Sequence, residues 1–101
     1  MKYKVKFPSR SIARKFMEVL EDIPDTQVQE KIMKEVEKLA DNPRPYGKKP
    51  FKKLKPPVSL YQFVAQYRLR IGNYRVLYDI DDKQKTVWIL ALRKRSEHTY
   101  K

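Results

Sequence analysis

The sequence contains no cysteine, which excludes disulfide bonds, zinc–thiolate sites and a cysteine nucleophile. It also lacks any apolar run near the roughly 20 residues that a membrane-spanning helix needs. The first residues, MKYKVKF, lack the apolar stretch of a signal peptide, so we expect a cytoplasmic protein. The sequence has no phosphate-binding glycine loop, no dinucleotide fingerprint and no cluster of metal ligands, and we therefore expect no cofactor and no metal.

Acidic residues are also scarce. The 101 residues include 12 acids against 24 lysines and arginines, which gives a formal net charge of +12. No acid lies between Asp41 and Asp79. This imbalance indicates a polyanionic partner, whereas a merely basic, solvated surface would mix its signs. The basic residues of the acid-free stretch are Arg44, Lys48, Lys49, Lys52, Lys53, Lys55, Arg68, Arg70 and Arg75.

The hydrophobic pattern in the first part of the chain predicts one strand and two helices. Residues 2–7 alternate between apolar and lysine side chains, which is typical of a half-buried strand. Residues 9–22 and 26–40 each carry an apolar stripe at helical spacing, with Ser9 and Asp25 as N-caps. A short turn joins the two segments, so we expect an antiparallel helix hairpin.

The second part of the chain predicts a loop followed by strands. Residues 41–57 contain five prolines and read as a loop, whose lysines form either a solvated arm or a rim that binds a polyanion. Strands are expected from about Leu60 to Ile71, from Tyr74 to about Ile80, and over TVWILALR, the last being central and covered on both faces. The fold class is therefore α+β in a single domain, 1–101. The helix hairpin lies on one face of a mostly antiparallel sheet, and a three-stranded antiparallel meander leaves a basic open face.

The stretch YRLRIGNYRVLY places like charges opposite each other. With Gly72 and Asn73 as a two-residue turn, Arg70 pairs with Arg75, and Arg68 lies on the same face. Like charges directly opposite each other destabilise a sheet. Either the arginines extend into solvent, or an anion such as phosphate binds between their planar, two-pronged donors. We favour the anion site.

The end of the chain can add to this basic face. If Trp88, Leu90 and Leu92 face the helices, strand alternation puts Arg93 on the open face. Arg95, His98 and Tyr100 follow in the tail. They are either ordinary exposed terminal residues, or they reach the basic face, where a tyrosine can stack on a base or exchange a proton.

The segments YRLRIGNYRVLYDI and ILALRKRSEHTY resemble the closing hairpin, last strand and tail of the RelE/ParE toxin superfamily. RelE-like members are endoribonucleases that cut mRNA in the ribosomal A site through the 2′-hydroxyl of the substrate. The resemblance implies a catalytic set of Arg68, Arg70, Arg75, Arg93 and Tyr100. In it, Arg75 and Arg93 hold the scissile phosphate, Arg68 and Arg70 position the backbone, and Tyr100 stacks on a base or transfers a proton.

Several roles and functions stay open within this resemblance. Arginine does not readily lose its proton, so Tyr100, His98 or a loop lysine is the candidate general base. The three functions are a ribosome-dependent endoribonuclease, which we favour, a ParE-like inhibitor of DNA gyrase, and a non-catalytic RNA-binding protein. The expected partners are a cognate acidic antitoxin, in a toxin–antitoxin hetero-oligomer, together with mRNA and ribosomal RNA, and no membrane. The expected RNA-binding residues are Lys48, Lys49, Lys52, Lys53, Lys55 and Arg95.

Overall fold

The computed structural model describes residues 2–45, 47 and 51–95. Five strands form one sheet in the order β1-β5-β4-β3-β2, in which β1 pairs parallel with β5 and all other pairs are antiparallel. No helix in these ranges is long and apolar enough to cross a membrane. The elements are β1 (Lys4–Lys6), α1 (Arg10–Glu21), α2 (Thr26–Lys38), β2 (Phe51–Leu60), β3 (Phe63–Ile71), β4 (Tyr74–Asp81) and β5 (Thr86–Lys94).

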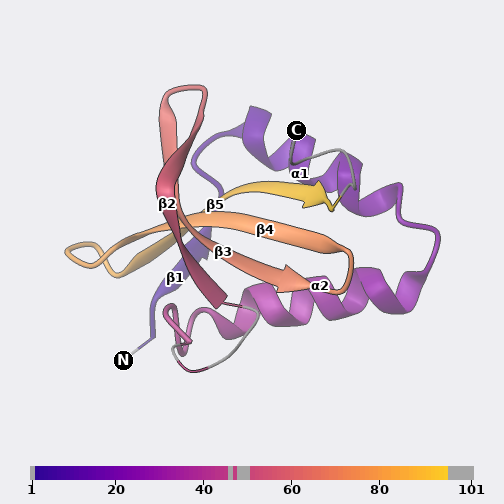
Figure 1. Ribbon diagram of the computed structural model, residues 1–101, viewed down its shortest axis with the longest axis horizontal. Helices are drawn as coiled ribbons and strands as arrows, with labels where there is room; N and C mark the ends of the chain where they lie inside the picture. The colour runs from indigo at the N-terminus through magenta and orange to yellow at the C-terminus, as the bar shows by residue number, and fades with distance from the viewer. Residues whose placement is uncertain (1, 46, 48–50, 96–101) are drawn as a thin grey trace.

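The two helices form where the sequence predicts them. The Ser9 hydroxyl accepts a hydrogen bond from the backbone N–H of Ile12 at 3.1 Å, and the Asp25 carboxylate accepts one from Gln27 at 2.9 Å. Both predicted N-caps are therefore confirmed, and each satisfies a backbone donor that the first helical turn leaves unpaired. The helices run in opposite directions across the sheet, joined by the turn before Asp25 (Figure 1).

The main core lies between these helices and one face of the sheet, which we call the helix face. Phe16 of α1 and Ile32 of α2 are almost completely buried against strand residues that include Tyr78. Removing such side chains from water supplies about 1.5–3 kcal/mol each. The strand residues predicted to cover the helices are confirmed as members of this core or packed against it: Tyr67, Leu69, Ile71, Tyr74, Val76 and Tyr78.

The predicted loop over 41–57 is wrong in its last part, because residues from Phe51 onward form β2. The strand pairs with β3 at the edge of the sheet, and its register shifts between Lys53 and Val58. Proline lacks a backbone donor, and an edge strand with an irregular ladder is where a sheet tolerates it. The meander that follows the helices therefore has four strands, not three.

The predicted long strand from Leu60 to Ile71 is also divided. Leu60 ends β2, Tyr61 and Gln62 form a turn, and β3 begins at Phe63. Tyr61 has a φ of 60°, a left-handed conformation that glycine and asparagine usually adopt. The sequence gives no turn signal at this point because neither of those residues, nor proline, is present.

A bulge in β5 overturns the predicted alternation of that strand. Ile89 pairs with Tyr78 and Ala91 pairs with Leu77, so Leu90 is an extra residue with no partner position on β4. As a result Leu92 joins the helix-face core, together with Val87 and Ile89, while Leu90 and Trp88 belong to a second cluster. The prediction that β5 is interior and buried on both faces is confirmed.

The face of the sheet away from the helices, which we call the outer face, is not fully open as predicted. The far half of the β2–β3 hairpin crosses over β4 and β5, and its tip reaches α1 (Figure 1). Leu60 and Ala65 of this hairpin cover Leu77 and Leu90 in the second cluster. The crossing hairpin buries this part of the outer face and leaves the part near the β3–β4 turn for the arginines.

Candidate functional site

Three arginines lie side by side across the outer face. Arg70 of β3 pairs with Arg75 of β4, and Arg75 pairs with Arg93 of β5. Arg68 pairs with Leu77 and lies one step away on the same face. We call Arg68, Arg70, Arg75 and Arg93 the arginine cluster. The predicted Arg70–Arg75 pair is confirmed, and it is part of a row that spans three strands.

Arg93 reaches this row only because of the β5 bulge. Val87 and Ile89 face the helices, so regular alternation would turn Arg93 toward the helices as well. The extra residue Leu90 reverses the alternation and places Arg93 opposite Arg75. The predicted position of Arg93 is therefore correct, although the alternation from which it was predicted is wrong.

The environment of the cluster opposes positive charge. Burial, followed by repulsion from Arg75, Arg70 and Arg95, lowers the pKa of Arg68 below its ordinary value. Burial, followed by repulsion from Arg95 and Arg70, likewise lowers the pKa of Arg75. The buried Nε of Arg68 has no hydrogen-bond partner, and Arg68, Arg70 and Arg93 form no salt bridge within the described part of the chain. An anion bound between these guanidinium groups would relieve the repulsion.

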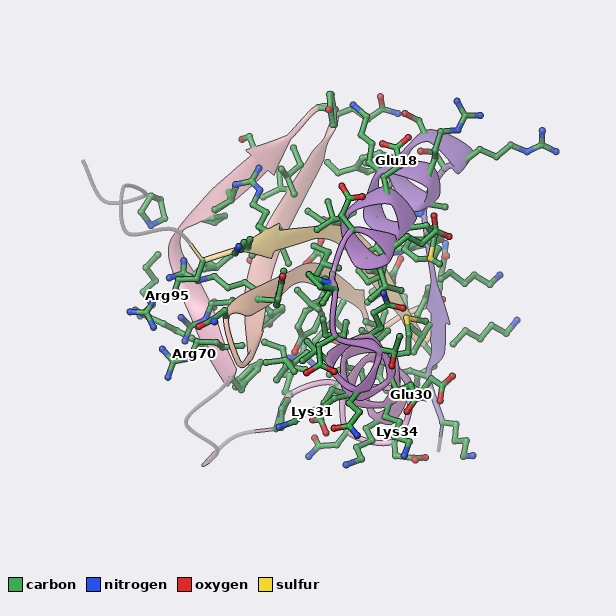
Figure 2. All side chains as sticks on the ribbon, turned by 90° about the vertical axis from the view of Figure 1, so that its right-hand side faces the viewer. Glu18, Glu30, Lys31, Lys34, Arg70 and Arg95 are labelled. Atoms are coloured by element: carbon green, nitrogen blue, oxygen red, sulfur yellow. The ribbon has the colours of Figure 1, made fainter. Side chains whose placement is uncertain are left out.

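Arg95 extends the positive charge beyond the end of β5. Its backbone N–H donates to the carbonyl of Asn73 at 2.6 Å, which ties the strand end to the β3–β4 turn. Figure 2 shows Arg95 and Arg70 on the same side of the molecule, both pointing away from the helices. The structure thus brings the predicted RNA-binding residue Arg95 to the arginine cluster.

The lysines predicted to bind RNA are divided by the register of β2. Lys52 pairs with Arg68 and shares the outer face, whereas Lys53 pairs with Tyr67, which belongs to the helix face. Lys55 is exposed in the segment where the register shifts. The remaining predicted site residues, Lys48, Lys49, His98 and Tyr100, lie outside the described residues.

Arg44, one of the basic residues of the acid-free stretch, has a structural role. Its guanidinium donates to both carboxylate oxygens of Asp82, at 3.1 and 2.9 Å, and to the hydroxyl of Tyr67 at 3.1 Å. The hydrogen bonds from Arg44 and from Tyr3 lower the pKa of Asp82 to about 2. Because its charge is neutralised by Asp82, we exclude Arg44 from the polyanion site.

The model of the family described as "ParE toxin of type II toxin-antitoxin system, parDE" matches residues 11–99. The chain belongs to this family. No curated protein matches the chain. The resemblance to the RelE/ParE superfamily seen in the sequence is therefore confirmed, and the chain is a toxin of the type II toxin–antitoxin class.

Solved structures agree with this assignment. The toxin is similar to a chain of the archaeal RelE–RelB complex from Pyrococcus horikoshii, with 27% identity, a TM-score of 0.69, and coverage of 96% of this chain and 99% of that chain. A chain of the RelBE2 complex from Mycobacterium tuberculosis has 23% identity and a TM-score of 0.65, and the match covers 96% of this chain and 95% of that chain. The isolated RelE toxin of Escherichia coli has 18% identity and a TM-score of 0.54, and the match covers 96% of this chain and 88% of that chain. The last two similarities show the fold.

Two hollows on the toxin surface adjoin the arginine cluster, and the sequence pattern predicts neither of them. One, of about 640 Å³, lies between α2 and the β3–β4 turn and is lined by Leu39, Ile71 and Arg70 among others. The second, of about 390 Å³, lies between α1 and the tip of the β2–β3 hairpin and is lined by Lys15, Tyr61 and Arg93 among others. The sequence pattern predicts Tyr61 inside a strand, and nothing in the sequence pairs it with α1.

The described residues offer no cluster of side chains that could bind a metal ion. Within the described ranges, no three side chains of His, Cys, Asp or Glu gather closely enough to hold a metal ion. The outer face presents guanidinium groups instead, whose fixed donors fit the oxygens of a phosphate.

Proposed function

We propose that this toxin cleaves mRNA in the ribosomal A site and thereby inhibits translation. The observation that carries the proposal is the row of Arg70, Arg75 and Arg93 in cross-strand register, with Arg68 beside it. Burial and mutual repulsion of the arginines disfavour their positive charge, and a bound phosphodiester would offset both effects with its negative charge. The similarity to a chain of the RelE–RelB complex from Pyrococcus horikoshii, over nearly the whole of both chains, supports the same branch of the superfamily.

In the proposed reaction the substrate supplies its own nucleophile. The 2′-oxygen forms a bond to phosphorus while the bond from phosphorus to the 5′-oxygen breaks, which leaves a 2′,3′-cyclic phosphate and a 5′-hydroxyl. Arg75 and Arg93 hold the phosphate and stabilise the negative charge that develops on its oxygens. Arg68 and Arg70 position the backbone, and water is not the attacking group.

The arginine cluster cannot take the proton from the 2′-hydroxyl, because a guanidinium does not readily release its own. We assign the general base and acid roles to His98, Tyr100 or a loop lysine. Among the loop lysines, Lys52 lies on the outer face opposite Arg68, whereas Lys48 and Lys49, like His98 and Tyr100, lie outside the described residues. Electrostatic stabilisation and positioning by the arginines then account for most of the rate enhancement.

We further propose that a cognate acidic antitoxin silences the toxin in the cytoplasm as a hetero-oligomer. The solved RelE–RelB structures are complexes of a toxin with its antitoxin. The larger hollow, between α2 and the β3–β4 turn, has an apolar lining that includes Leu39 and Ile71, and basic residues that include Lys31 and Arg95. An amphipathic acidic segment has the matching chemistry, and there it would cover one end of the arginine cluster.

A second candidate function is inhibition of DNA gyrase by binding. The match to the ParE toxin family over residues 11–99 favours it. The third candidate is an RNA-binding protein without catalysis, which the arginine cluster alone would support.

One experiment separates the three functions. Purified toxin is added to ribosomes programmed with a defined mRNA, and the message is mapped for cuts in the A site. We expect cuts with the wild type and with the charge control Lys6→Gln on β1, and none with Arg75→Ala or Arg93→Ala. Absence of cuts together with blocked gyrase supercoiling establishes the second function, and salt-sensitive RNA binding without either activity establishes the third.

A further inference from the structure

The tip of the β2–β3 hairpin holds an aromatic residue in a conformation that suits glycine. Tyr61 has a φ of 60°, and Gly72, the first residue of the β3–β4 turn, has a φ of 59°. The two hairpins thus bend with the same positive φ at their first turn residue, and only one of them uses glycine there. A bulky residue in the left-handed region is uncommon, and such outliers point to a function that retains them.

Tyr61 does not serve the core. The residue is 71% exposed, and it belongs to neither hydrophobic cluster. Lys15 of α1 donates a hydrogen bond to its hydroxyl, and the Nζ of Lys15 lies 4.4 Å from the centre of the ring. The toxin therefore presents an aromatic ring at its surface, in contact with α1 and mostly open to solvent.

Tyr61 lines the hollow of about 390 Å³, a volume within the roughly 300–1,000 Å³ typical of small-ligand sites. Its lining combines an apolar base with positive charge. Arg93 comes from β5 and Lys15 from α1. The buried apolar residues of the lining are Ile12, Phe16, Leu60, Leu90 and Leu92.

Arg93 connects this hollow to the arginine cluster. It pairs with Arg75 in the row across the outer face, and it also lines the hollow. A strand of RNA whose phosphate lies between Arg75 and Arg93 would therefore continue toward α1 and the hairpin tip. Single-stranded nucleic acid is bound by this combination of a positive track and aromatic rings on which bases stack.

We propose that this hollow binds one nucleotide of the RNA substrate next to the scissile phosphate, with its base stacked on Tyr61 and its phosphate held by Lys15 and Arg93. The inference rests on the proposed function, because it places the site on the path of the same RNA. A nucleotide fits the observed chemistry because it offers an apolar ring face and an anion a few ångströms apart. Stacking does not discriminate among bases, so we expect the site to contribute affinity more than sequence preference.

The test uses a short RNA with 2′-O-methyl groups, which lacks the nucleophile and stays intact, and a matched strand with an abasic position. Fluorescence of 2-aminopurine placed at successive positions reports stacking. We expect wild-type toxin to quench the fluorescence of 2-aminopurine at one position of the RNA, and Tyr61→Leu to lose that quenching. Tyr61→Leu should also bind the RNA roughly 5- to 150-fold more weakly, which is the range for the loss of one stacked base. Tyr61→Trp should retain binding, and the difference between wild type and Tyr61→Leu should vanish on the abasic strand.

Val64→Ala is the matched control, because Val64 is the other exposed large apolar side chain among the described residues and lies on the same hairpin, at 45% exposure. It should leave RNA binding unchanged. The inference is overturned if Tyr61→Leu binds RNA as well as wild type, or if both substitutions weaken only antitoxin binding, which would make the tip a protein-docking element. If Tyr61→Leu binds normally while Arg75→Ala does not, the proposed function stands without the nucleotide site. If wild-type toxin binds no RNA at all, the nucleotide site fails, whereas the proposed function fails only if programmed ribosomes show no cuts in the A site.

Discussion

Replacing Arg70 with glutamine should make the toxin more stable and weaken its RNA binding. Arg70 lies directly opposite Arg75, and it contributes to the repulsion that lowers the pKa of both Arg68 and Arg75. Cross-strand charge pairs change stability by roughly 0.2–1 kcal/mol, and Arg70 is half-buried at the sheet surface. We therefore expect Arg70→Gln to raise the free energy of unfolding by about 0.5 kcal/mol at low salt. For a domain of this size, the gain corresponds to roughly 2–4 °C in Tm.

Salt distinguishes this electrostatic gain from a change in packing. The screening length falls from about 10 Å at 0.1 M salt to about 3 Å at 1 M. Urea unfolding of the wild type and Arg70→Gln should therefore give different midpoints at low salt and nearly equal midpoints at 1 M. In RNA binding, loss of one phosphate contact to a single strand should reduce the salt slope by about 0.7.

Lys6→Gln is the matched control for net charge. Lys6 is exposed on β1 and pairs with the neutral Trp88, so its removal changes the total charge equally without relieving an opposed pair. Repulsion between Arg70 and Arg75 does not limit stability if Arg70→Gln is no more stable than wild type at low salt, if its gain persists at 1 M, or if Lys6→Gln produces the same gain.

Three further predictions concern polar groups outside the arginine cluster. Tyr78→Phe should lower the stability by about 1–2 kcal/mol in urea unfolding, because the buried hydroxyl donates to the carbonyl of Pro43 at 2.8 Å and the carbonyl would lose that partner. Burial raises the pKa of Asp79, so the charged form opposes folding at neutral pH. Asp79→Asn should therefore have a higher Tm than the wild type at pH 7. The difference in Tm should disappear at low pH, where Asp79 of the wild type is protonated in both the folded and the unfolded state. The pKa of Asp82 is depressed to about 2, so its stabilising contribution is present above pH about 4 and lost as pH falls toward 2. Asp82→Asn should flatten that part of the Tm–pH profile, and an unchanged profile would contradict the role assigned to the Arg44–Asp82 pair.

Local signals in the sequence are sufficient to predict the two helices and the turn that brings Arg70 and Arg75 together. The apolar stripes and the caps Ser9 and Asp25 are local signals, and each helix forms at those positions. Gly72 and Asn73 fix the register of the β3–β4 hairpin, because a two-residue turn allows only one pairing. The Arg70–Arg75 pair follows from that register alone.

The surroundings of this pair depend on contacts between segments that lie far apart in the chain. The β5 bulge that aligns Arg93 with Arg75 depends on packing between the two faces of the sheet, and no residue in β5 signals it. The hairpin turn at Tyr61 carries no glycine, asparagine or proline, so no local signal divides the predicted strand there. The crossing of that hairpin over β5 brings Tyr61 to Lys15, 46 positions apart in the chain. Local propensity acts over a few residues, whereas these contacts depend on the twist of the whole sheet and on burial of the second cluster.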